Sequence, residues 1–172
     1  MINRIRSKFG KNVFFAPWDC PLSGIEPLFF IGLLEVQDIR FFLGAKDAIY
    51  VVTIPRRSVF RLIDETHLGT LMNVLTEAET EQPLGKNEVW NRKTWKVWGT
   101  PFLKELGSLV FIDYPKKDQF QYLILTEDES PEFVCYSPKI DVYQSRNGNE
   151  IMERLFEEDM RTRKQKELGC GI

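Results

Sequence analysis

The segment from Ser108 to Tyr136 places the strongest constraint on the fold, because it carries three short apolar runs separated by polar turn residues. The runs are rich in β-branched and aromatic residues, which favours strands. The first run, LVFI, lacks polar alternation and is typical of a strand covered on both faces. Pro115 suits the second position of a type I turn. The segment therefore predicts an antiparallel hairpin near 108–126, followed by a third strand.

A second hairpin is predicted near 39–54, where two runs of β-branched and aromatic residues flank a short polar connection. Further strands are expected at 12–16 and 139–143. The apolar run at 28–36 is too short for its periodicity to distinguish a strand from a buried helix. Strands therefore dominate both halves of the chain.

Two main helices are predicted, near 58–80 and 149–166. In the first, apolar residues recur at helical spacing, although Gly69 weakens the helix interior. The second has an apolar face that ends at Met160 and three acid–base pairs spaced i,i+4, each worth about 0.2–0.5 kcal/mol. These pairs are Glu150 with Arg154, Glu157 with Arg161, and Asp159 with Arg163.

The expected fold class is α+β, a mainly antiparallel sheet built from hairpins and covered by the two helices. The length of 172 residues and the lack of a long polar linker favour one domain spanning 1–172. Residues 1–11 are basic and predict either a mobile arm or a short amphipathic helix. Residues 167–172 are expected to fray.

Bulk charge and cysteine content restrict the partners and the compartment. A net charge of −2 provides no general field for an anionic polymer, which argues against non-specific nucleic-acid binding by the whole molecule. The three cysteines, Cys20, Cys135 and Cys170, are widely spaced and odd in number, which suits reduced thiols in the cytoplasm. The longest apolar window, 27–34, is too short to cross a membrane.

No cofactor or metal is predicted from motifs. The segment Gln82–Asn87 contains a Gly-Lys pair, but Thr80 stands where a phosphate loop needs its first glycine. No GxGxxG occurs, so a dinucleotide site has no support. The single histidine, His67, lies on the apolar stripe of its predicted helix and is interpreted as a core residue.

Acidic residues supply a weaker motif for catalysis. Asp113 ends a predicted core strand with Lys116 close behind, an arrangement that some metal-dependent nucleases use. A strand end entering a polar turn is the preferred explanation, because isolated motif similarities have high false-positive rates. The acidic stretch TEDESPE lacks the glycine and the later glutamate of a calcium-binding loop.

The candidate binding residues lie between Glu88 and Trp98, a segment that fits neither helical nor strand periodicity cleanly. Its aromatic rings could stack on bases while its cations meet phosphates, or both could anchor a protein partner. The alternative is that the rings fill the core and the charges face solvent. The candidate residues are Trp90, Arg92, Lys93, Trp95, Lys96 and Trp98.

Three functional hypotheses follow. The first is a small cytoplasmic, non-catalytic domain that binds a protein partner, such as an inhibitor, an immunity-like factor or a regulatory adaptor. The second is single-stranded nucleic-acid binding through residues 88–98. The third is an enzyme with an unfamiliar acidic site that uses Asp113, Glu127 or His67. The acidic net charge favours a protein partner over nucleic acid.

Overall fold

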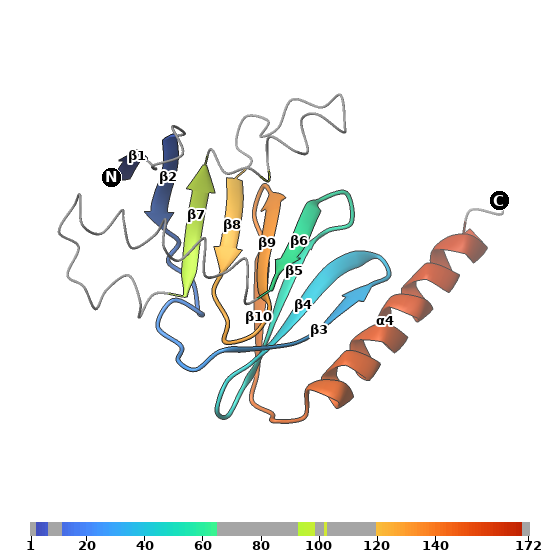
Figure 1. Ribbon diagram of the computed structural model, residues 1–172. Helices are drawn as coiled ribbons and strands as arrows, with labels where there is room; N and C mark the ends of the chain where they lie inside the picture. The colour runs from blue at the N-terminus through green and yellow to red at the C-terminus, as the bar shows by residue number, and fades with distance from the viewer. Residues whose placement is uncertain (1–2, 7–11, 65–92, 99–101, 103–119, 170–172) are drawn as a thin grey trace.

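The computed structural model describes residues 3–6, 12–64, 93–98, 102 and 120–169. Within them the chain forms ten strands and one helix, arranged as two antiparallel sheets with the helix packed on one of them (Figure 1). The six-stranded sheet runs β1 (Asn3–Arg6), β2 (Asn12–Pro17), β7 (Thr94–Trp98), β8 (Phe120–Ile124), β9 (Ser130–Cys135), β6 (Val59–Ile63). The four-stranded sheet runs β10 (Lys139–Tyr143), β5 (Ile49–Pro55), β4 (Asp38–Gly44), β3 (Phe29–Glu35).

One bent two-stranded ribbon joins the two sheets. Strands β5 and β6 are consecutive, as are β9 and β10, and the two pairs run antiparallel to each other. Thr53 lies opposite Lys139 in the four-stranded sheet, and Val59 lies opposite Val134 in the six-stranded sheet. At the bend, the Ser58 N–H donates to the Pro55 carbonyl at 2.8 Å. The ladder therefore keeps nearly the same register while it crosses from one sheet to the other.

Aromatic rings fill the space between the sheets. Phe41 of β4 stacks on Phe133 of β9 with ring centroids 5.4 Å apart, and Phe133 stacks on Tyr122 of β8 at 5.5 Å. Trp18 meets Tyr122 edge-on at 4.6 Å. Phe41 and Phe133 are fully buried. Rings of this size bury much area each, so this stack dominates the contact between the layers.

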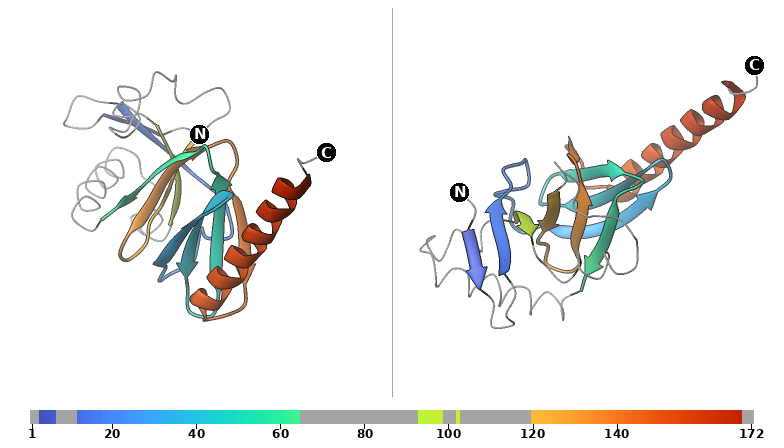
Figure 2. Two further views of the ribbon diagram at one scale, coloured as in Figure 1. Left: turned by 90° about the vertical axis from the view of Figure 1, so that its right-hand side faces the viewer. Right: turned by 90° about the horizontal axis from the view of Figure 1, so that it is seen from above.

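Helix α4 (Gly148–Gly169) covers the other face of the four-stranded sheet. The Asn147 side chain caps it by accepting the Glu150 N–H at 3.2 Å. Ile151 and Leu155 of the first turns are buried in one cluster with β4 and β5 residues. The layers are therefore six-stranded sheet, four-stranded sheet and helix (Figure 2).

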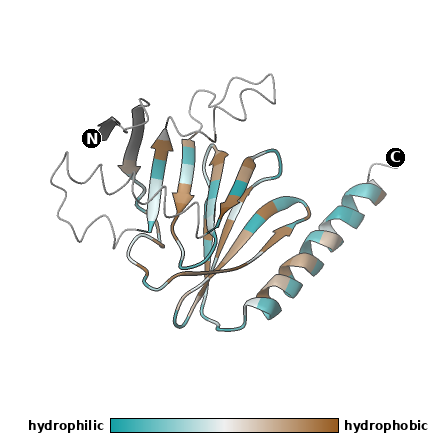
Figure 3. Cartoon of the chain, in the orientation of Figure 1, coloured by the Kyte–Doolittle hydropathy of each residue, from teal (hydrophilic) through white to brown (hydrophobic). Residues whose placement is uncertain are grey.

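A salt bridge fixes the middle of α4 on the sheet. Asp159 binds the guanidinium of Arg40 through both carboxylate oxygens, with Nη2 to Oδ1 at 2.9 Å. The Gln37 side-chain amide donates to the Asp159 carbonyl at 2.9 Å. Beyond Met160, residues 161–168 are exposed, and the helix continues past the sheet as a hydrophilic extension (Figures 2 and 3).

The predicted i,i+4 pairs on this helix form only in part. Arg161 bonds Glu157 at 3.0 Å as expected. Asp159 binds Arg40 and not the predicted Arg163. Arg154 lies 3.9 Å from Glu158 and is not paired with the predicted Glu150. A tertiary contact therefore replaces one of the three predicted pairs, and a different local pair replaces another.

The expectation of a sheet covered by two main helices was wrong. In the described part of the chain the only helix element is α4, and Val59–Ile63, the start of the predicted 58–80 helix, is strand β6. Phe60 and Leu62 pack into the inter-sheet core, whereas Arg61 points to the opposite face, toward Glu132. The side chains therefore alternate between the two faces with the period of two that a strand shows. Residues 65–80 of that predicted helix, including His67, lie outside the described residues.

Several local predictions are confirmed. The 39–54 hairpin is β4 and β5, and the expected strands at 12–16 and 139–143 are β2 and β10. The ambiguous run at 28–36 is strand β3. The prediction of a mobile arm or a short amphipathic helix for residues 1–11 was wrong for Asn3–Arg6, which forms strand β1 because it pairs with β2. The first strand of the 108–126 hairpin lies outside the described residues. No described helix combines the length and the apolar character that crossing a membrane requires.

Replacement of Phe133 by Ala should lower the free energy of unfolding by about 3–5 kcal/mol, because it opens a cavity between the sheets. Urea denaturation measures the change. Tyr136→Ala serves as the control, since this ring is 53% exposed and its loss should change stability by no more than about 0.5 kcal/mol. Equal losses in the two variants would contradict the assigned role of the aromatic stack.

Stability should fall at alkaline pH because of two groups in the same core. Burial raises the pKa of Cys135 to about 12, and burial together with Cys135 raises the pKa of Tyr122 to about 12. An unfolded cysteine loses its proton near pH ~8.5, whereas folded Cys135 keeps it, so stability is lost as pH rises above that value. Unfolding curves between about pH 7.5 and pH 10 test this slope, which Cys135→Ala should reduce.

Candidate functional site

The predicted aromatic and basic segment ends in strand β7, which lies inside the six-stranded sheet between β2 and β8. Trp95 is only 3% exposed and Val97 is fully buried, on one face of the strand. Trp95 lies opposite Leu123 of β8, which is also fully buried. This ring is therefore part of a packed face and is not presented to solvent.

Lys96 points to the opposite face of β7, toward the other sheet. Its ammonium lies 4.5 Å from the centre of the Phe120 ring and 5.8 Å from that of Tyr122. A cation over an aromatic face is attracted by about 0.5–1 kcal/mol or more, depending on its exposure. Lys96 is half-buried, so it borders the core with its charge on two rings.

The other candidates of this segment are only partly described. Trp90 and Arg92 lie outside the described residues. The backbone of Trp98 pairs with Phe14 of β2, and its side chain is not described. The structure therefore does not bring the six predicted residues together on one surface, and binding through this segment stays a prediction.

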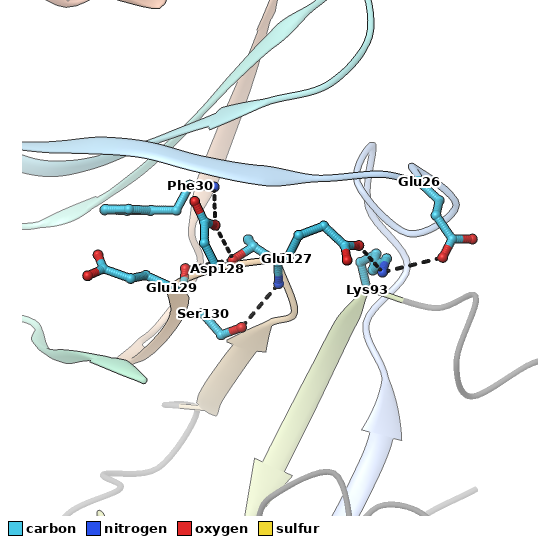
Figure 4. Close-up of polar contacts among 8 residues, drawn as sticks. Glu26, Phe30, Lys93, Glu127, Asp128, Glu129 and Ser130 are labelled. Carbon is cyan, nitrogen blue, oxygen red and sulfur yellow. Dashed lines mark hydrogen bonds and ion pairs between the residues drawn. The ribbon is translucent and has the colours of Figure 1, made fainter. Parts of the chain in front are cut away.

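Lys93 lies just before β7 and forms the centre of an ionic cluster. Its ammonium is 3.1 Å from Glu127 Oε1 and 3.6 Å from Glu26 Oε1 (Figure 4). The lysine is buried, whereas both glutamates are about half exposed. We call Lys93, Glu26 and Glu127 the Lys93 cluster. It places a buried cation between two carboxylates that remain hydrated.

The loop that carries Glu127 is held against the start of β3. Asp128 Oδ1 accepts the Phe30 N–H at 2.8 Å and the Thr126 hydroxyl at 3.1 Å (Figure 4). The Glu127 N–H donates to the Leu28 carbonyl at 2.9 Å. The acidic stretch considered as a calcium loop therefore binds backbone and a lysine, and it joins the two sheets.

The chemistry available to this cluster is limited by these bonds. The Lys93 ammonium is neutralised by its partners, and Glu127, one of the three residues named for an acidic enzyme site, is committed to it. Asp113 and His67, the other two, lie outside the described residues. Within the described ranges no three histidine, cysteine or acidic side chains gather in a way that could hold a metal ion.

A second ionic pair lies on the far face of the six-stranded sheet. Glu132 is 1% exposed and accepts from Arg61 Nε at 2.5 Å and from the Gln121 amide. The Arg61 guanidinium also lies 4.7 Å from the centre of the Phe102 ring. This pair cross-links β6, β8 and β9, so its role is structural.

Three of the six large apolar side chains that are exposed in the described residues lie at the β3 edge of the other sheet. Phe29 and Ile31 of β3 are 46% and 37% exposed, and Phe156 of α4 is 45% exposed. A bulge at Ile31 shifts the register, so that Ile31 and Gly32 both face the helix. We call Phe29, Ile31, Met152 and Phe156 the β3 edge surface.

Close packing shows that this surface is continuous from strand to helix. A Cβ on Gly32 would lie 2.9 Å from the Met152 methyl carbon, and one on Gly148 would lie 3.1 Å from the Ile31 side chain. Phe156 lies one helical turn after Met152, on the same flank of α4. The first turns of α4 thus extend the apolar edge of β3.

Sequence reasoning missed both features. The 28–36 run was recognised as apolar, but its edge position depends on strand order. Glu26, Lys93 and Glu127 are far apart in the chain, and only the pairing of β7 with β8 brings Lys93 near Glu127. The signal in the sequence that could have indicated the Lys93 cluster is the acidic stretch TEDESPE, which follows a predicted strand and contains Glu127.

Comparison with known proteins adds no relative. No family model matches the chain, and no curated protein and no solved structure matches it either. The candidate sites therefore depend on the geometry described above.

The two sides of the Lys93 cluster should respond differently to substitution. The double variant Glu26→Ala/Glu127→Ala leaves the buried Lys93 ammonium without its two carboxylate partners. This variant should lose about 3 kcal/mol of stability. Lys93→Met leaves two glutamates that are about half exposed and should cost less than about 1 kcal/mol. Urea denaturation compares the variants. A larger loss for Lys93→Met would contradict this account.

Proposed function

We propose that this protein is a small non-catalytic domain that binds a protein partner through the β3 edge surface. The observation that carries the proposal is the exposure of Phe29, Ile31 and Phe156 beside the edge strand of the four-stranded sheet. Exposed apolar groups that gather in one place mark interaction sites more often than scattered ones do. An inhibitor, an immunity-like factor or a regulatory adaptor would act in this way.

The edge strand supports the same proposal. β3 is the last strand of its sheet, and within the described residues no strand pairs with its outer edge. Proteins commonly protect such edges with lysine, proline or a covering segment. β3 (FFIGLLE) contains neither lysine nor proline, and the protection that the described part of the chain gives it consists of a bulge and a cap at its start. Such an edge can accept a partner strand.

A cytoplasmic location forms part of the proposal. It is supported by Cys20 and Cys135, both of which are free thiols. Reduced thiols are the usual state of cysteines in the cytoplasm.

A photo-reactive phenylalanine analogue at Phe156, introduced into the full chain in the cells that make it, tests the proposal. Ultraviolet light should join this position to a protein, because Phe156 would lie within the interface. Mass spectrometry identifies the cross-linked peptide and its parent protein.

The same analogue at Tyr136 provides the matched control. This aromatic residue is 53% exposed but lies at the bend between β9 and β10, and β10 is the edge strand of the four-stranded sheet opposite to β3. Adducts should be frequent at Phe156 and rare at Tyr136. Equal labelling at the two positions, or labelling of nucleic acid alone, would refute the proposal.

A further inference from the structure

The outer edge of β3 is divided into a closed half and an open half. In the closed half, Glu127 binds the Leu28 carbonyl and Asp128 binds the Phe30 N–H. After the bulge at Ile31, Gly32 and Leu34 pair with β4 in register with Phe42 and Arg40. Backbone direction alternates along a strand, so the N–H and C=O groups of Leu33 and Glu35 face outward.

The closed half of this edge carries negative charge. Glu26, Glu127, Asp128 and Glu129 lie around it, and Lys93 is the cation among them (Figure 4). Four carboxylates against one lysine give this end a net negative charge.

The opposite end of the edge carries positive charge. There a cleft of about 440 Å³ opens between the β3–β4 turn and the projecting part of α4, and its cations are Arg56, Arg163 and Lys166. Arg57 follows Arg56 directly, and the exposed Arg161 and Lys164 lie on α4. These six cations exceed the four carboxylates of the turn, the cleft and the adjoining part of the helix, which are Glu35, Asp38, Glu157 and Glu167. The edge therefore has an acidic start and a basic end.

We propose that the partner is a second copy of this chain, paired antiparallel through β3 about a two-fold axis at Leu34, so that the outward groups of Leu33 lie opposite those of Glu35 in the partner. This inference rests on the proposed function and identifies the partner. A two-fold axis brings each surface against itself in reverse, so the acidic start of one strand meets the basic end of the other. In that register Gly32 of one copy lies opposite Val36 of its partner, which places Asp128, bound to Phe30 before the bulge, beside the partner's β3–β4 turn and its basic cleft.

The apolar residues fit the same arrangement. Ile31, Met152 and Phe156 lie on the helix side of the edge. Pairing of the two edges continues the four-stranded sheet into that of the second copy and brings these side chains together across the axis. The exposed apolar groups and the outward backbone groups are then covered in one step.

Sedimentation equilibrium of the full chain across a range of concentrations tests the inference. The mass should rise from 20.2 kDa toward twice that value, and added salt should weaken the dimer. Glu35→Pro removes an outward N–H from an edge position where proline is tolerated, and it should abolish the dimer while the melting temperature is largely kept. Lys139→Ala, on the opposite edge strand of the same sheet, should leave the dimer intact.

A charge exchange tests the register without relying on proline. Glu129→Lys and Lys166→Glu should each weaken the dimer by about 2–5-fold, because each places like charges together. The double variant restores opposite charges across the axis and should regain most of the lost affinity. If Glu35→Pro unfolds the chain, the charge exchange alone tests the proposed dimer.

The inference is overturned if the chain remains a monomer up to its solubility limit. It is also overturned by a dimer that is insensitive to both Glu35→Pro and the charge variants. If the chain is a monomer and Phe156 cross-links to a different protein, the partner is not a second copy. The proposed function, binding of a protein partner, is then still supported. Absence of any protein adduct at Phe156, with a dimer formed elsewhere, would remove both.

Discussion

The organising constraint of this protein is that the central strands of its four-stranded sheet, β4 and β5, are buried on both faces. Along β5, Tyr50, Val52 and Ile54 face the six-stranded sheet, whereas Ile49 and Val51 face α4. A strand covered on both sides cannot alternate between apolar and polar residues. The apolar runs of β4 and β5 follow from this, and so does the need for a layer on each side.

Ionic groups fix the layers at both ends of the β3–β4 pair. Near the start of β3, the Lys93 cluster and Asp128 attach the loop of the six-stranded sheet. Near the β3–β4 turn, Arg40 and Asp159 attach the helix. Apolar packing is non-directional, so such directed bonds set how each layer is oriented.

Sequence patterns predicted the elements whose signals are local. The 39–54 hairpin and the C-terminal helix have clear periodicity and turn residues, and both are present. Val59–Ile63 was assigned to a helix because five residues cannot separate a period of 3.6 from a period of 2; its pairing with β9, far along the chain, decided the outcome. The burial of Trp95 and the partners of Lys93 likewise depend on neighbours that no local pattern specifies.

The bent ribbon has a consequence for how the chain reaches this structure. Val51 pairs with Asp141, about 90 residues later, and both sheets share this ladder. Closing so large a loop costs chain entropy before the contacts compensate for it, and folds dominated by distant pairings form slowly. Until β9 and β10 join, β5 lacks one of its two neighbouring strands and Phe41 of β4 lacks its stacking partner Phe133, so the unfinished chain is the form most exposed to aggregation.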